Sequence, residues 1–205
     1  MRIEGSDKSV HMRLMTQRSD GTKNRQELLN AAQEVFAQKG VDAPLDLVRQ
    51  RAGVGRATMY RNFPDRVNLH LALVEDSLQR LEMRDQSDEP GNDTVTSLLS
   101  AIVDEVARSP ALHLVWDRLR EDPEMSAPYI ERLRDIVAVP LAQAMQEGSV
   151  SPDLTVEDIF LAVRMLGATS RGSCFAERQA EARRALKILL AGLGTNQNSI
   201  PETEQ

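Results

Sequence analysis

Basic and polar side chains gather in one short stretch, AGVGRATMYRNFPDR, which spans residues 52–66 and opens with a glycine turn. Guanidinium groups bind guanine edges and phosphate oxygens, and hydroxyl and amide groups donate hydrogen bonds to phosphates. An exposed basic helix face would explain any single arginine here, but the clustering favours a surface that contacts nucleic acid. The residues that would form this surface are Arg56, Ala57, Thr58, Tyr60, Arg61, Asn62 and Arg66.

Two short helices must position these side chains. We expect the first to run from after Pro44 to Ala52 and the second to cover residues 55–62, with Pro64 ending it. A glycine between them supplies the positive φ that a tight turn requires. This arrangement is typical of a helix-turn-helix, which places its second helix in the major groove of DNA. The residues that would hold the two helices together are Val48, Gly53, Val54, Met59 and Phe63.

The whole chain predicts an all-α fold with about nine helices. Helix formers such as Ala, Leu, Arg, Glu and Gln dominate its 205 residues, and alternating runs of β-branched residues are almost absent. Apolar residues recur at spacings of three and four, as in amphipathic helices. Besides the two short helices, we expect helices over residues 24–39, 66–84, 93–108, 110–120, 123–147, 155–171 and 175–192.

Charge and pattern divide the chain into regions. Residues 1–65 carry 11 Lys and Arg against 8 Asp and Glu, whereas residues 66–205 carry 14 against 23, within a net charge of −6. A basic head on an acidic body is typical of proteins that bind nucleic acid. The expected regions are a flexible arm at 1–23, a helix-turn-helix domain at 24–66, a helical body at 67–194 and a flexible tail at 195–205.

The composition excludes several other classes of protein. Cys174 is the single cysteine, so no disulfide forms within the chain, and the three histidines form no metal-binding pattern. No P-loop, nucleophile elbow, HExxH motif or dinucleotide-binding glycine run is present, so we expect neither an enzyme nor a bound cofactor. No segment approaches the ~20 apolar residues of a membrane helix, and a signal-peptide core is missing. We therefore expect a cytoplasmic protein without a membrane partner.

Two alternatives to DNA binding remain at this point: a helical adaptor and a small enzyme. Acidic pairs such as Asp104 and Glu105 look like solvated helix faces rather than an active site. The glycine turn followed by a basic helix disfavours both alternatives.

Residues 44–69 resemble the DNA-binding head of TetR-type (tetracycline-repressor-like) transcriptional regulators. The family pattern is an AGV turn, then T-[LIM]-Y-x-x-F, then a basic residue that opens the next helix. The residues that match are Ala52-Gly53-Val54, Thr58-Met59-Tyr60, Phe63 and Arg66. Two residues depart from the pattern. Asn62 replaces a common histidine, and Arg49 replaces a small alanine, so that the helix docks differently or the arginine reaches solvent or DNA.

The resemblance implies a DNA-binding transcriptional regulator, with repression as the usual mode of the family. Such proteins bind a pseudo-palindromic double-stranded DNA operator as a homodimer and respond to a small-molecule effector. The body, residues 67–194, would then bind the effector and form the dimer. We expect an effector to shift the helix that begins near Arg66 and so to alter the spacing of the two heads.

Candidate residues in the body follow from their types. The residues that either line a ligand cavity or form the core are Leu73, Leu99, Val103, Leu112, Trp116, Tyr129, Phe160 and Met165. His113, Arg118 and Arg164 either meet a polar or anionic ligand group or lie on solvated faces. Small and apolar residues of the last two helices either form a dimer seam or an ordinary core pair, namely Gly167, Ala168, Ala182, Ala185 and Leu189.

Overall fold

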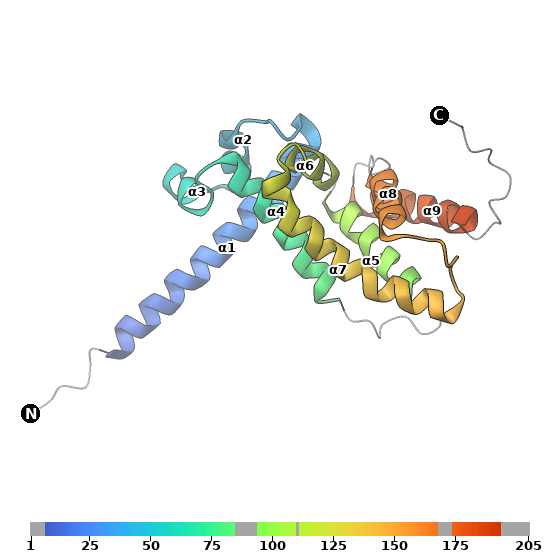
Figure 1. The fold of residues 1–205 in the computed structure, drawn as a ribbon. Coiled ribbons are helices and arrows are strands. Elements are labelled where there is room, and N and C mark those ends of the chain that lie inside the picture. Colours follow the sequence, from blue (N-terminus) through green and yellow to red (C-terminus); the bar gives the residue numbers. More distant parts are fainter. Residues whose placement is uncertain (1–6, 85–93, 110, 168–173, 194–205) are drawn as a thin grey trace, which may run out of the picture. The chain divides into compact units, whose positions relative to one another are not determined.

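The computed structural model describes residues 7–84, 94–109, 111–167 and 174–193, and in these ranges the chain forms α-helices and no strand (Figure 1). The predicted all-α fold is confirmed. The helices are α1 (Asp7–Lys39), α2 (Leu45–Ala52), α3 (Arg56–Asn62), α4 (Arg66–Glu82), α5 (Thr94–Arg108), α6 (Leu112–Leu119), α7 (Pro123–Glu147), α8 (Val156–Gly167) and α9 (Phe175–Leu193). The predicted tail at 195–205 and Ala168 lie outside the described residues.

The chain divides into two compact units, residues 1–73 and 74–205. The division falls inside α4, whereas the sequence placed it at residue 66. Apolar residues at helical spacing continue without a proline or glycine from Arg66 to Glu82, so one helix contributes to both units.

α1 begins at Asp7, which corrects the expectation of an arm without regular structure over residues 7–23. No proline interrupts residues 7–39, and Met, Arg, Gln and Lys favour helix in the part before Gly21. A glycine inside a helix costs about 1 kcal/mol relative to alanine, which is too little to end a helix of this length. The polarity of the segment had suggested disorder, but helix propensity decides its local structure.

Apolar residues of α1, α2, α3 and the first turns of α4 form the core of the first unit. α1 packs on both α2 and α3. The buried apolar side chains of this core include Leu28, Phe36, Val48, Met59, Phe63 and Leu69. On the surface, Arg51 of α2 forms an ion pair with Glu34 of α1. This exposed pair contributes at most about 1 kcal/mol, so burial of the apolar residues holds the unit together.

α5 is the central helix of the second unit, since it packs on α7, α8 and α9. Its buried residues Leu98, Leu99, Ile102 and Val103 follow helical spacing and belong to one core cluster. The neighbouring helices have defined starts. The Asp122 carboxylate accepts from the Met125 N–H at 3.1 Å at the start of α7, and Thr155 and Asp158 form a reciprocal capping box at the start of α8.

Candidate nucleic-acid interface and ligand cavity

Gly53 makes the turn between α2 and α3. Its φ of 68° lies in the left-handed region, where glycine is the favoured residue. The Gly53 N–H donates to the Gln50 carbonyl at 3.2 Å, and the Val54 N–H donates to the Arg49 carbonyl at 3.3 Å. These two bonds form a Schellman motif, which ends α2 and redirects the chain into α3.

The apolar residues predicted to pack the two helices together are buried. Val48 is fully buried, Met59 and Phe63 are each 1% exposed, and Val54 is 8% exposed. The guanidinium carbon of Arg25 on α1 lies 4.7 Å from the centroid of the Phe63 ring. This cation–π contact closes the outer edge of the core and fixes the end of α3 against α1.

The opposite side of α3 faces solvent. Arg56, Ala57 and Arg61 are exposed, Tyr60 is 44% exposed, and Thr58 is half-buried. Residues four apart share a helix face, so Arg56 stands beside Tyr60, and Ala57 stands beside Arg61. Burial of Met59 on the inside therefore orients a continuous polar surface toward solvent.

Two of the predicted contact residues have partners inside the protein. The Asn62 amide nitrogen donates to the Thr58 carbonyl at 2.8 Å. Nη1 of Arg66 donates to the carbonyls of Val41 and Ala43, at 2.7 Å in each case. These two side chains thus support the end of α3 and the loop before α2, a role that their residue types alone did not indicate.

Arg49 forms a clasp across the helix-turn-helix. Its Nε donates to the Asp46 carboxylate at 2.7 Å, and its Nη1 donates to the Val54 carbonyl at 3.2 Å. The hydrogen bond from Arg49 lowers the pKa of Asp46 below its ordinary value. Because Val48 stays buried beside it, α2 docks against the core with the arginine lying along the turn. The Asp46–Arg49 spacing of three was the only sequence signal for this clasp.

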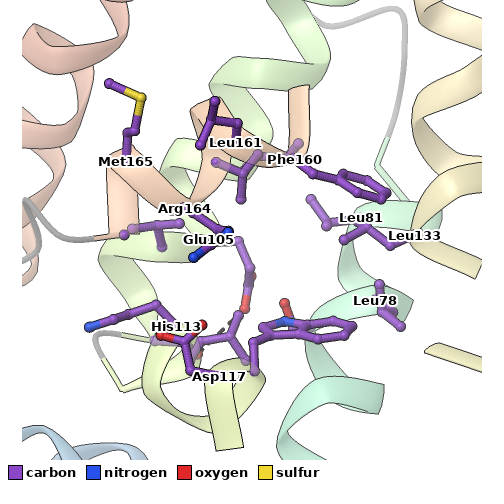
Figure 2. Close-up of a pocket in the computed structure, with 18 of the residues that line it drawn as sticks. Leu78, Leu81, Glu105, His113, Asp117, Leu133, Phe160, Leu161, Arg164 and Met165 are labelled. Atoms are coloured by element: carbon purple, nitrogen blue, oxygen red, sulfur yellow. Dashed lines mark hydrogen bonds between the residues drawn. The ribbon is translucent and has the colours of Figure 1, made fainter. Parts of the chain in front are cut away.

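The second unit contains a cavity of about 340 Å³ (Figure 2). Of the eight residues proposed for a cavity, Leu112, Trp116, Phe160 and Met165 line it. The other four do not: Leu73 is buried in the first unit, Leu99 and Val103 are buried in the core around α5, and Tyr129 is half-buried outside the lining. Of the three polar candidates, His113 and Arg164 line the cavity, whereas Arg118 pairs with Glu121 on the surface.

A buried ion pair in the cavity wall was missed by the sequence analysis. Glu105, whose side chain is 6% exposed, accepts from Nε and Nη2 of Arg80 at 2.9 and 2.6 Å. Burial opposes the charge on Arg80, but the hydrogen bonds to Glu105 and Asp76 outweigh it and raise the Arg80 pKa above its ordinary value. Glu105 stands between Asp104 and Arg108 near the end of α5, where the sequence suggests a solvated residue, so only its contact with Arg80 of α4 reveals the pair.

Two of the residues proposed for the dimer seam are buried within one chain. A Cβ placed on Gly167 would lie 2.9 Å from the Cβ of His113, so this glycine allows α8 to approach α6. Ala182 is fully buried in the core, and Ala185 and Leu189 are half-buried against it. The large apolar side chains that α8 and α9 expose are Leu161 at 54%, Met165 at 51%, Phe175 at 39% and Ile188 at 66%.

No group of three His, Cys, Asp or Glu in the part of the chain that the structure describes is placed to hold a metal ion. None of the helices in the same ranges has both the length and the hydropathy needed to cross a membrane.

The comparisons with known proteins agree with this geometry. Residues 28–73, which lie within the first unit and run from inside α1 to inside α4, match the model of bacterial regulatory proteins of the tetR family. The HTH-type transcriptional repressor AcnR of Corynebacterium glutamicum is 26% identical over 159 residues, which is 73% of this chain and 82% of AcnR.

Solved structures share the fold over most of the chain. A tetR-family regulatory protein from Rhodococcus RHA1 has a TM-score of 0.60 at 21% identity and covers 85% of this chain and 98% of its own. A TetR transcription regulatory protein from Mycobacterium vanbaalenii has a TM-score of 0.54 at 25% identity and covers 86% and 98%. The family model over residues 28–73 and the repressor relative, together with a fold shared over most of the chain, support a TetR-family transcriptional regulator, and residues 28–73 carry the match to the family.

Proposed function

We propose that this regulator is a ligand-responsive repressor that binds a pseudo-palindromic operator as a homodimer. The observation that carries the proposal is the two-sided structure of α3. Arg56, Tyr60 and Arg61 face solvent, while Met59 on the same helix is buried against the head. The surface that would enter the major groove is therefore fixed in orientation before DNA arrives, which lowers the entropic cost of binding.

The exposed residues divide into two proposed roles. Arg56 opens α3, the end of a recognition helix that lies nearest the base edges, and its guanidinium matches the two acceptors of guanine. Tyr60, Arg61 and Thr58 would donate to phosphates, and Ala57 would allow the helix to approach closely. We assign Asn62 and Arg66 to positioning, because their side chains donate hydrogen bonds to backbone carbonyls of the head.

Dimerisation through α8 and α9 is supported by the apolar side chains that these packed helices expose. Ile188 is 66% exposed on α9, and Leu161 is 54% exposed on α8. Two heads about 34–36 Å apart would meet successive major grooves on one face of DNA. Sedimentation of Ile188→Glu tests the seam: we expect a monomer with weakened operator affinity, whereas an unchanged dimer would place the interface elsewhere.

The ligand response is supported by the cavity and by α4. This helix begins with Arg66, which bonds the loop before α2, and it contributes Ser77, Leu78 and Leu81 to the cavity wall. If α4 adopts two placements, a ligand that binds the protein more tightly in one of them shifts the equilibrium toward that placement and so alters operator affinity. The same coupling requires the operator to weaken or strengthen ligand binding by the same factor.

Selection from a library of random DNA duplexes tests the proposal directly. We expect the full chain to enrich an inverted repeat, and we expect Arg56→Ala to enrich it poorly while Arg118→Ala enriches it as the wild type does. The control removes the same charge from an exposed arginine of α6. Enrichment of no common sequence, or equal behaviour of the two variants, would contradict a sequence-reading role for α3.

A further inference from the structure

In the cavity of the second unit, the apolar lining residues and the polar lining residues lie on different sides. Leu78, Leu81, Leu133 and Phe160 gather on one side, and His113 and Asp117 of α6 lie on the other, as Figure 2 shows. Trp116 and Ile102 extend the apolar surface. A volume of about 340 Å³ is sufficient for a small organic ligand. The lining therefore fits a molecule with an apolar body and a single polar end.

The acidic groups of the lining already have cationic partners. Glu105 receives two hydrogen bonds from Arg80, and a second arginine, Arg108, lies 3.8 Å from the same carboxylate. Asp117 lies 3.6 Å from Nη1 of Arg120. Because these carboxylates are compensated, they do not favour a cationic ligand.

Arg164 is the lining cation that forms no ion pair with any residue in the described ranges. It is exposed, so it stands where water reaches the cavity mouth. Figure 2 shows its side chain extending from α8 toward the cavity. Gly167, one turn further along α8, contacts His113, so Arg164 and His113 belong to the same polar side. The uncompensated charge at the polar side is therefore positive.

From this arrangement we propose that the cavity binds an anionic amphiphile, a molecule with an apolar chain or ring and one carboxylate or similar anionic head. The apolar body lies against Phe160, Leu81 and Leu133, and the head lies at the mouth beside Arg164 and His113. This assignment rests on the proposed ligand response and specifies the chemical class of the effector. An arginine suits such a head, because its planar fork donates two hydrogen bonds to a carboxylate.

Trp116 provides a direct readout, since it is the single tryptophan of the chain and lines the cavity. The full-length protein is titrated with decanoate, decanol and decyltrimethylammonium below their micellar concentrations, and tryptophan emission is followed. These three probes share a ten-carbon chain and differ in head-group charge. We expect decanoate to bind saturably and about tenfold or more tightly than decanol, with the cation weakest.

Arg164→Gln tests the residue, with Arg118→Gln as a matched control outside the lining. We expect Arg164→Gln to reduce the preference for decanoate over decanol to near unity without changing decanol binding, and the control to keep the preference. Equal or tighter binding of the neutral or cationic probe, an unchanged preference in Arg164→Gln, or no saturable signal with any probe would overturn the proposal.

Operator affinity, measured in parallel by fluorescence anisotropy, separates this assignment from the proposed function. Decanoate binding with the expected dependence on Arg164 supports the ligand class whether or not the operator is released. If the cavity fills in this way and operator affinity stays constant, the proposed regulation fails and the ligand class stands.

Discussion

The two units display their functional residues in opposite ways. In the first unit the residues proposed to act stand on the outside of α3, and buried residues of the same 15-residue stretch, 52–66, hold that helix in place. In the second unit a hollow is lined by side chains from α4 to α8, which are far apart in the sequence. A convex site is encoded locally, whereas a cavity depends on where several helices leave space unfilled. Variants in each unit can test the two sides of this contrast.

Removal of the Phe63 side chain should have the largest effect on stability. Phe63 is 1% exposed and lies under Arg25, so Phe63→Ala leaves a cavity in the core of the head. We expect a loss of about 3–5 kcal/mol in the free energy of unfolding. Urea denaturation followed by circular dichroism measures it, with the exposed neighbour Tyr60→Ala as control. Equal losses in the two variants would show that the local core does not hold α3.

The buried pair beside the cavity should give the next largest effect. Arg80→Met leaves Glu105 without its bidentate partner, and we expect a loss of about 3 kcal/mol, at the lower end for buried pairs because the Arg80 side chain is 28% exposed. The double variant Arg80→Met, Glu105→Leu removes the stranded charge and should recover most of this loss. If the double variant is as unstable as the single one, packing of the Arg80 stem rather than charge stabilises the wall.

An alanine substitution at Gly53, in the turn of the head, should lower the stability of the protein more than the same substitution at Gly55. Gly53 has a φ of 68°, so Gly53→Ala should destabilise the protein by about 1–2 kcal/mol. Gly55 has a φ of −70° with open space around its Cβ position, so Gly55→Ala should change stability by no more than about 0.5 kcal/mol. Thermal melts of both variants make the comparison, and similar melting temperatures would contradict the strained-turn explanation.

The smallest effect concerns pH. The Arg49 hydrogen bond holds the pKa of Asp46 below its ordinary value in the folded protein. The stabilising contribution of the ionised carboxylate is therefore present above that ordinary value and disappears as the pH falls through the folded pKa. Urea midpoints should therefore show Asp46→Asn as less stable than wild type at neutral pH and equal to it in strong acid. Asp42→Asn, an exposed change nearby, should show no such convergence. If the stability difference between Asp46→Asn and wild type does not change with pH, the Asp46–Arg49 ion pair is not its cause.

The same contrast explains which features of the two units could be predicted from the sequence. The turn at Gly53 and the burial of Val48, Met59 and Phe63 follow from spacing within one short stretch, and the structure places them as that spacing indicated. Trp116 and Phe160 line the cavity, whereas Leu99 and Val103 lie in the core. This difference depends on how each helix is oriented in the fold, which the spacing of apolar residues does not predict.

The hydrogen-bond partners of several polar side chains also could not be predicted from the sequence. Arg66 and Asn62 carry the donors that phosphates attract, yet their hydrogen bonds run to backbone carbonyls. The clasp of Arg49 on Val54 joins the two sides of the turn, so it appears only once the turn is folded.

The most direct test of the central claim is the affinity ratio between the selected operator and a scrambled duplex, measured by fluorescence anisotropy for wild type, Arg56→Ala and Arg61→Ala. If Arg56 reads a base, its loss should lower this ratio by about 5- to 150-fold, which corresponds to about 1–3 kcal/mol. Arg61→Ala should weaken both duplexes alike and reduce the salt dependence of binding, as loss of a phosphate contact does. An unchanged ratio in Arg56→Ala would contradict sequence reading by the exposed face of α3.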